Sequence, residues 1–191
     1  MINYLIEAAW AVFLLYWGWN WLRVKPAVRA EPVLPRLLKY WLPLGVAVLL
    51  IEPTGLFDAT PLGLRFVPLA AAPACVWIGA ALTWAGVLFA CAARFVLGRN
   101  WSSVVQLKQG HELIVAGPYR LVRHPIYTGL LLAFIGTALA IGEWRGVLGT
   151  LIVGLSFWFK LRLEERWMRE RFGAAYLEYM RGTWALIPGV L

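Results

Sequence analysis

The chain alternates between long apolar stretches and short polar segments. Five stretches are apolar over most of a helix length, at 3–22, 37–51, 66–97, 126–142 and 146–159. A helix needs about 20 mostly apolar residues to cross the hydrocarbon core of a bilayer. The pattern therefore predicts an all-α, polytopic membrane helical bundle with about five transmembrane helices, in which residues 1–191 form a single membrane domain.

A different periodicity follows the last apolar stretch. Between residues 160 and 181 apolar side chains recur at helical spacing, with charged residues on the opposite face. This pattern predicts a C-terminal amphipathic helix that leaves the membrane and lies along its interface. The composition agrees, because 61% of residues are hydrophobic and only 15% are charged, whereas soluble domains carry about 25% charged residues.

Basic residues gather in alternate polar segments. The stretches 23–39, 94–124 and 160–181 hold all but two of the 18 Lys and Arg residues. Positively charged loops stay cytoplasmic, so we expect the N-terminus outside and the C-terminus and active site in the cytoplasm of a plasma (inner) membrane. The net charge of +8 indicates this topology and attraction to anionic membrane lipids. It does not indicate nucleic-acid binding, because no soluble basic domain is evident.

Polar residues that could bind a ligand or take part in catalysis lie at the start of the fourth apolar stretch, within 117–129. Pro125 suits the first turn of a helix, so His124 would cap that helix or precede it. Free backbone N–H groups at a helix N-terminus favour an anion such as a ligand carboxylate. Arg, His and Tyr at the mouth of a membrane helix therefore predict a ligand site at the membrane face. The alternative is an ordinary boundary between loop and helix.

The tail contains a second candidate group. Glu164 and Glu165 are about 100° apart on a helix, so they cannot both point at one atom. Glu164 shares a helix face with Lys160, four residues earlier. The alternative is a solvated charged face. With only two His residues in the chain, no metal site is expected. Tryptophans near the ends of the apolar stretches, such as Trp17 and Trp101, are predicted as interface anchors.

The motifs in this half of the chain carry a family resemblance. The segment GPYRLVRHPIYTG is preceded by HELIVA and followed by EERWMRERFGAAYLEYMRGTWALIPGV. In combination these motifs resemble the isoprenylcysteine carboxyl methyltransferase family and the related membrane phospholipid methyltransferases. The resemblance covers residues 97–191, which would form the cofactor-binding and catalytic half, after N-terminal spans in 1–96.

The resemblance implies S-adenosylmethionine (SAM) in a cytosol-facing pocket made by the last helices and the loop before them. The implied cofactor-binding positions are His111, Glu112, Leu113, Ile114, Tyr119, His124, Pro125, Ile126, Tyr127 and Glu164. Glu164 would bind the cofactor ammonium or take a proton from an acceptor. Family members carry an Arg four residues before this Glu to orient the acceptor; here Lys160 takes that place, with Arg162 nearby.

The resemblance also implies a lipidic or hydrophobic methyl acceptor that reaches the site from the bilayer. Lys cannot make the planar bidentate contact that Arg makes to a carboxylate. The acceptor therefore stays open among an isoprenylcysteine-like carboxylate, a phospholipid amine and a thiol. Two other functions stay open: an NADPH-dependent membrane reductase of the sterol-reductase type, whose sequences share a similar RHPxYxG segment, and a non-catalytic membrane scaffold.

Overall fold

The computed structural model describes residues 2–21, 27–52, 55–98, 101, 106–108 and 112–190. The helices are α1 Ile2–Trp21, α2 Val33–Arg36, a π-helical turn Leu37–Trp41, α3 Leu42–Ile51, α4 Ala72–Leu97, α5 Pro125–Ile141, α6 Trp144–Phe172 and α7 Ala174–Arg181. Short 3-10 turns cover Pro61–Gly63, Leu69–Ala71 and Gly117–Arg120, and the two strands are β1 Ala27–Ala30 and β2 Gln106–Lys108.

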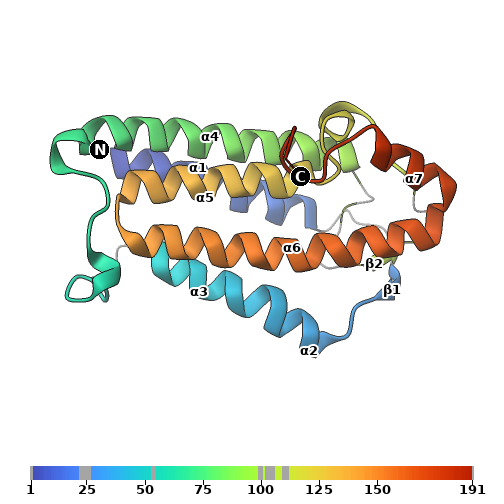
Figure 1. Cartoon of the computed structure of the whole chain (residues 1–191), viewed down its shortest axis with the longest axis horizontal. Coiled ribbons are helices and arrows are strands. Elements are labelled where there is room, and N and C mark those ends of the chain that lie inside the picture. Colours follow the sequence, from blue (N-terminus) through green and yellow to red (C-terminus); the bar gives the residue numbers. More distant parts are fainter. Residues whose placement is uncertain are drawn as a thin grey trace.

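The long helices lie side by side along the long axis of the molecule (Figure 1). α5 packs between α4 and α6, α3 packs on α6, and α1 packs on α4. This arrangement confirms the predicted helical bundle. Within the described residues, three helical stretches, Val33–Ile51, Leu69–Leu97 and Trp144–Phe172, are long and apolar enough to cross a membrane, and α5 is a shorter apolar helix.

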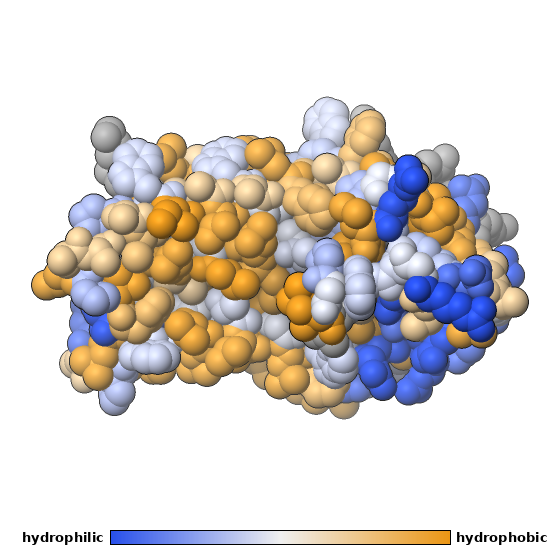
Figure 2. Space-filling view, turned by 45° about the horizontal axis from the view of Figure 1, so that its top comes forward, coloured by the Kyte–Doolittle hydropathy of each residue, from blue (hydrophilic) through white to orange (hydrophobic). Residues whose placement is uncertain are grey.

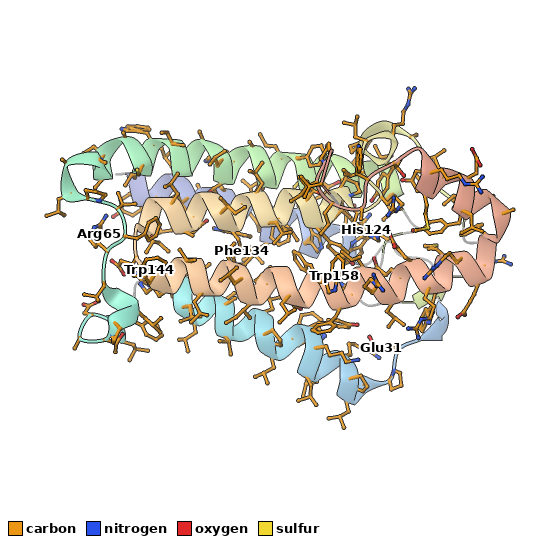
Figure 3. All side chains as sticks on the ribbon, in the orientation of Figure 1. Glu31, Arg65, His124, Phe134, Trp144 and Trp158 are labelled. Atoms are coloured by element: carbon orange, nitrogen blue, oxygen red, sulfur yellow. The ribbon has the colours of Figure 1, made fainter. Side chains whose placement is uncertain are left out.

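The surface is divided along the same axis. Apolar residues cover most of the length of the bundle on the face in Figure 2, and the strongly hydrophilic residues of that face gather mainly at the end that carries α7. That end also holds β1, β2 and His124, whereas Arg65 and Trp144 lie at the opposite end (Figures 1 and 3). On this face the molecule thus has an apolar body and a strongly hydrophilic end at α7.

Small residues determine the closest helix contact, between α4 and α5. Gly129 of α5 faces Gly86 of α4. Further along the same two helices, Gly136 of α5 faces Gly79 of α4. A Cβ atom at Gly129 or at Gly136 would lie 2.6 Å from the facing carbonyl oxygen, so neither position has room for one. The small residues of α5 therefore let its backbone pack directly against that of α4, as in other membrane helix pairs.

Replacing Gly129 by Ala is expected to loosen this contact. The added methyl group forces α4 and α5 apart, and overpacking of this kind costs about 1–3 kcal/mol. For a chain of this size we expect the thermal midpoint in detergent to fall by about 3–10 °C. Gly45→Ala is the matched control, because a Cβ at Gly45 in α3 meets nothing within 4 Å; equal midpoints for the two variants would contradict the packing argument.

The structure differs from the sequence expectations at the polar end. The tail was expected to form a separate interfacial helix from residue 160, but α6 continues without interruption to Phe172. The break comes at Gly173, whose φ of +53° belongs to the left-handed region that glycine adopts readily. The chain then turns back as α7. Apolar periodicity could not locate this break, because the helical pattern runs through it.

A two-stranded ribbon joins the first and second basic segments. β1 and β2 are antiparallel, with Ala27 opposite Lys108 and Ala30 opposite Gln106. Residues 112–115 carry no strand, and His111 lies outside the described residues. Short pairings between distant segments leave too weak a local pattern for sequence analysis.

Candidate functional site

The segment before α5 is held by the end of the chain. The N–H of Arg123 donates to the carbonyl of Trp184 at 2.8 Å, and the N–H of His124 donates to the carbonyl of Ala185 at 3.1 Å. The Thr128 hydroxyl donates to the carbonyl of Leu186 at 2.7 Å. Pro125 begins α5 with His124 as its N-cap, as its lack of an N–H predicts. The two parts expected to form the pocket therefore meet.

The centre of the site is a contact between α5 and α6 (Figure 3 labels His124 there). The hydroxyl of Tyr127 donates to Glu164 Oε1 at 2.6 Å. Nδ1 of His124 lies 3.4 Å from Glu164 Oε2, and the His124 and Tyr127 rings are stacked with centroids 5.5 Å apart. Both oxygens of the Glu164 carboxylate thus have partners, which stabilise its ionised form.

Glu165 approaches the same histidine from its other side. Its Oε1 accepts from Arg123 Nε at 2.8 Å and lies 3.4 Å from His124 Nε2. The second approach lacks hydrogen-bond geometry, so Nε2 is a buried nitrogen without a hydrogen-bond partner. The two adjacent glutamates therefore reach different atoms of one imidazole ring, which agrees with their angular separation on a helix.

These carboxylates affect the protonation of His124. Burial by itself lowers the pKa of His124, but the Glu164 and Glu165 carboxylates, each 3.4 Å from a ring nitrogen, outweigh burial and raise the pKa above its ordinary value of 6.5. His124 therefore favours the imidazolium form, in which both ring nitrogens are donors. At this end of the site the positive charge of the His124 imidazolium is therefore held between the negative charges of Glu164 and Glu165.

The raised pKa gives a pH dependence of stability with a definite sign. A group whose pKa is higher in the folded state stabilises the fold fully below its unfolded pKa, and this contribution is lost as pH rises through the folded pKa. We expect the thermal midpoint of the wild type to exceed that of His124→Gln by more at about pH 6 than at about pH 9. A difference between the two proteins that is independent of pH would contradict this charge assignment.

Lys160 lies one helical turn before Glu164 and is half-buried between aromatic rings. Its Nζ is 5.3 Å from the ring centroid of Tyr127 and 5.8 Å from that of Tyr40. Such distances allow cation–π attraction. Arg162 instead is exposed, with its guanidinium 5.4 Å from the Trp158 ring. The structure therefore brings Lys160 to the site and directs Arg162 away from it.

These residues border a cavity of about 1220 Å³ that runs along the bundle. The cavity reaches Tyr176 and Tyr179 of α7 at one end and Arg65 and Arg145 at the other. Of the expected site residues, those that line it are Glu112, Leu113, Ile114, Tyr119, His124, Ile126, Tyr127, Lys160 and Glu164. Pro125 and Arg162 do not line it, and His111 is outside the described residues.

Aromatic residues that the sequence analysis did not assign to the site also line the cavity. Trp17 of α1 and Trp101 were expected only as interface anchors, but their rings meet edge to face at 5.8 Å in the cavity wall. Arg94 is buried against Trp101, with its guanidinium 4.5 Å from the ring centroid. No sequence pattern joins α1 to residue 101, so only the folded chain shows this wall.

Tyrosines close the polar end of the cavity. The hydroxyl of Tyr179 donates to the carbonyl of Tyr119 at 2.6 Å, which links α7 to the turn before α5. Burial raises the pKa of Tyr119 above its usual range and raises the pKa of Tyr179 to about 12, although Arg123 opposes the second shift. Both phenols are therefore neutral at physiological pH and cannot act as bases there.

Comparison with known proteins gives one family match. A family model described as phospholipid methyltransferase matches residues 74–175, which is more than half of the chain. This span contains nearly all of α4 and the whole of α5 and α6, and therefore includes His124, Tyr127, Lys160 and Glu164.

Individual relatives are more distant. The protein-S-isoprenylcysteine O-methyltransferase of Dictyostelium discoideum is 27% identical over 117 residues, which is 60% of this chain and 49% of the relative. A probable protein-S-isoprenylcysteine O-methyltransferase of Oryza sativa subsp. indica is 30% identical over 115 residues, 59% of this chain and 60% of the relative. The cobalt-zinc-cadmium resistance protein CzcN of Cupriavidus metallidurans is 30% identical over 115 residues, 59% and 51%. The chain thus matches about half to three fifths of each relative.

Proposed function

The chain belongs to the phospholipid methyltransferase family, and from this membership we propose that it is an integral-membrane methyltransferase. The methyl donor is SAM, and the acceptor is a lipidic or other hydrophobic molecule. The observation that carries the proposal is the Glu164 carboxylate, fixed by Tyr127 and His124 at the polar end of a long apolar cavity. The family match favours this activity over a reductase or a scaffold.

The residues at the polar end fit the parts of the cofactor. The Glu164 carboxylate would receive the ammonium of its methionine part, because two opposite charges pair strongly away from water. The N-terminus of α5 beside His124 would receive the carboxylate. Tyr119 and Tyr127 would form the wall, and the negative face of an aromatic ring favours a cationic sulfonium. When bound, SAM supplies a methyl group that is already activated for transfer.

The contribution of the protein is then alignment and the exclusion of water. The partners of Glu164 keep its charge in place, which favours ammonium binding over the alternative role of proton acceptor. Lys160, on the same face of α6 and in the same cavity, would orient the acceptor. The acceptor could be a carboxylate, a phospholipid amine or a thiol.

The shape of the cavity supports a lipidic acceptor. Beyond Lys160 its walls are mainly apolar, with Leu130, Phe134 and Phe157 on α5 and α6 and Leu44 on α3. Arg145 and Met168 both border it and are 23 positions apart on α6, so the cavity extends for roughly 35 Å at the rise of an α-helix. A long apolar chain would fit in this space with its reactive head at Glu164.

The orientation in the membrane completes the proposal. The end with His124 and α7 would face the cytoplasm, the source of SAM, with the N-terminus outside. This placement follows the distribution of Lys and Arg. The inner (plasma) membrane is the proposed location.

Methyl transfer tests the proposal directly. Purified protein in lipid nanodiscs would be incubated with methyl-labelled SAM and with lipid, prenylcysteine and thiol acceptors in separate reactions. We expect label in one acceptor class, and no label with the matched Glu164→Ala protein. Labelled product formed equally by both proteins, or no labelled product from any acceptor, would count against the proposed activity.

A further inference from the structure

We infer that Glu165 is a positioning residue that acts through Arg123 to fasten the C-terminal segment over the cofactor end of the cavity. The C-terminal segment means residues 183–186, which follow α7. The inference deepens the proposed function and, for its effect on the cofactor, rests on it. Glu165 itself does not line the cavity, whereas its neighbour Glu164 does.

The first step is a buried ion pair. The side chains of Glu165 and Arg123 are each 9% exposed, and Nε of Arg123 donates to Oε1 of Glu165 at 2.8 Å. When a guanidinium and a carboxylate are both removed from water, each stabilises the other, because either one without its partner would be an unpaired buried charge. Glu165 therefore fixes where the guanidinium of Arg123 lies.

The second step is what that guanidinium holds. Its NH1 group donates to the carbonyl of Met180 at 3.4 Å and also to the carbonyl of Thr183. These two carbonyls belong to the last turn of α7 and to the first residue of the C-terminal segment. One side chain therefore connects α6, through Glu165, to the place where the chain leaves α7.

The third step links the C-terminal segment to the candidate site. The backbone N–H groups of Arg123 and His124 donate to Trp184 and Ala185 of the C-terminal segment, so the segment and the N-cap of α5 are held together. The Glu165 carboxylate also lies beside Nε2 of His124. If Arg123 lost its partner, the C-terminal segment would loosen, and His124 would lose its fixed position beside Glu164.

This arrangement assigns different work to the adjacent glutamates. Glu164 faces the cavity and would contact the cofactor. Glu165 lies beside Nε2 of His124, outside the cavity, and would hold Arg123 and His124, which line the cavity, in place. Loss of Glu165 should therefore weaken cofactor binding while the turnover of bound substrate changes little, because the groups that touch the reacting atoms remain.

The experiment compares Glu165→Gln with Glu178→Gln, a matched control whose carboxylate is on the exposed side of α7. Hydrogen–deuterium exchange with mass spectrometry is followed on the whole chain in detergent. We expect exchange of peptides covering 182–190 to rise about tenfold in Glu165→Gln, with α4 and α5 unchanged and the control like the wild type. Unchanged exchange at 182–190, or a uniform rise over all helices, would overturn the inference.

Two further arms separate positioning from general stability. Arg123→Met combined with Glu165→Gln should raise exchange no more than Arg123→Met alone, because Glu165 acts through Arg123; additive effects would contradict this coupling. In kinetics, Glu165→Gln should raise the KM for SAM about tenfold and change kcat by less than threefold, and a fall in kcat alone would overturn the assignment. The exchange result needs no cofactor, so it stands or falls separately from the methyltransferase proposal.

Discussion

Glu164→Gln is expected to weaken SAM binding by at least about 30-fold and to reduce methyl transfer to background. The substitution keeps the size of the side chain but removes the charge that would pair with the cofactor ammonium. Truncating one partner of a buried charge pair costs about 2–5 kcal/mol, and each 1.4 kcal/mol is about tenfold in affinity. The His124 imidazolium would also lose the negative charge that stabilises it.

The measurement is isothermal titration of SAM into protein purified in detergent. Glu178→Gln controls for the loss of any one carboxylate, since this residue is 75% exposed and pairs with Arg181 on the helix surface. The control should bind as the wild type does. If Glu164→Gln bound SAM within a factor of three of the wild type while folding normally, Glu164 would not be the cofactor ligand.

Lys160→Met is expected to reduce methyl transfer by about 30-fold or more while SAM affinity changes by less than about threefold. Lys160 is half-buried, with its ammonium between the rings of Tyr40 and Tyr127, and it borders the cavity beside Glu164. In this low-dielectric position a cation would bind an anionic acceptor strongly. Met keeps the apolar stem and removes only the charge.

Arg162→Met is the matched control, because Arg162 is on the same helix but is exposed and outside the cavity. It should leave methyl transfer unchanged. Lys160→Arg should recover part of the activity, since the charge returns with a different shape. Equal losses for Lys160→Met and Arg162→Met would contradict the proposed role of Lys160 in orienting the acceptor.

Much of the fold follows from local pattern. The apolar runs predicted the long helices, and Pro125 predicted the start of α5. The continuation of α6 to Phe172 was not predicted, because an amphipathic period looks the same in one long helix as in two helices. A break at Gly173 depends on a φ that only the folded chain reveals.

Some residues of the candidate site could likewise be proposed from the sequence, whereas others are evident only in the folded structure. Spacing and resemblance proposed motif residues such as His124, Tyr127 and Glu164 as site residues, and the structure places them in contact with one another. Trp17 could not be identified, because its place in the cavity depends on how α1 packs against α4. The partnership of Arg123 with Glu165 was also missed, since 42 residues separate them and each alone looks like an ordinary surface charge.

The central claim is that SAM binds where the segment before α5 meets α6 and α7. Ultraviolet crosslinking of methyl-labelled SAM, followed by peptide mapping with and without excess S-adenosylhomocysteine, tests it most directly. The account predicts label that competitor removes, on peptides carrying Tyr119, Tyr127 or Tyr176. Label confined to α2 and α3, or label that S-adenosylhomocysteine does not displace, would contradict it.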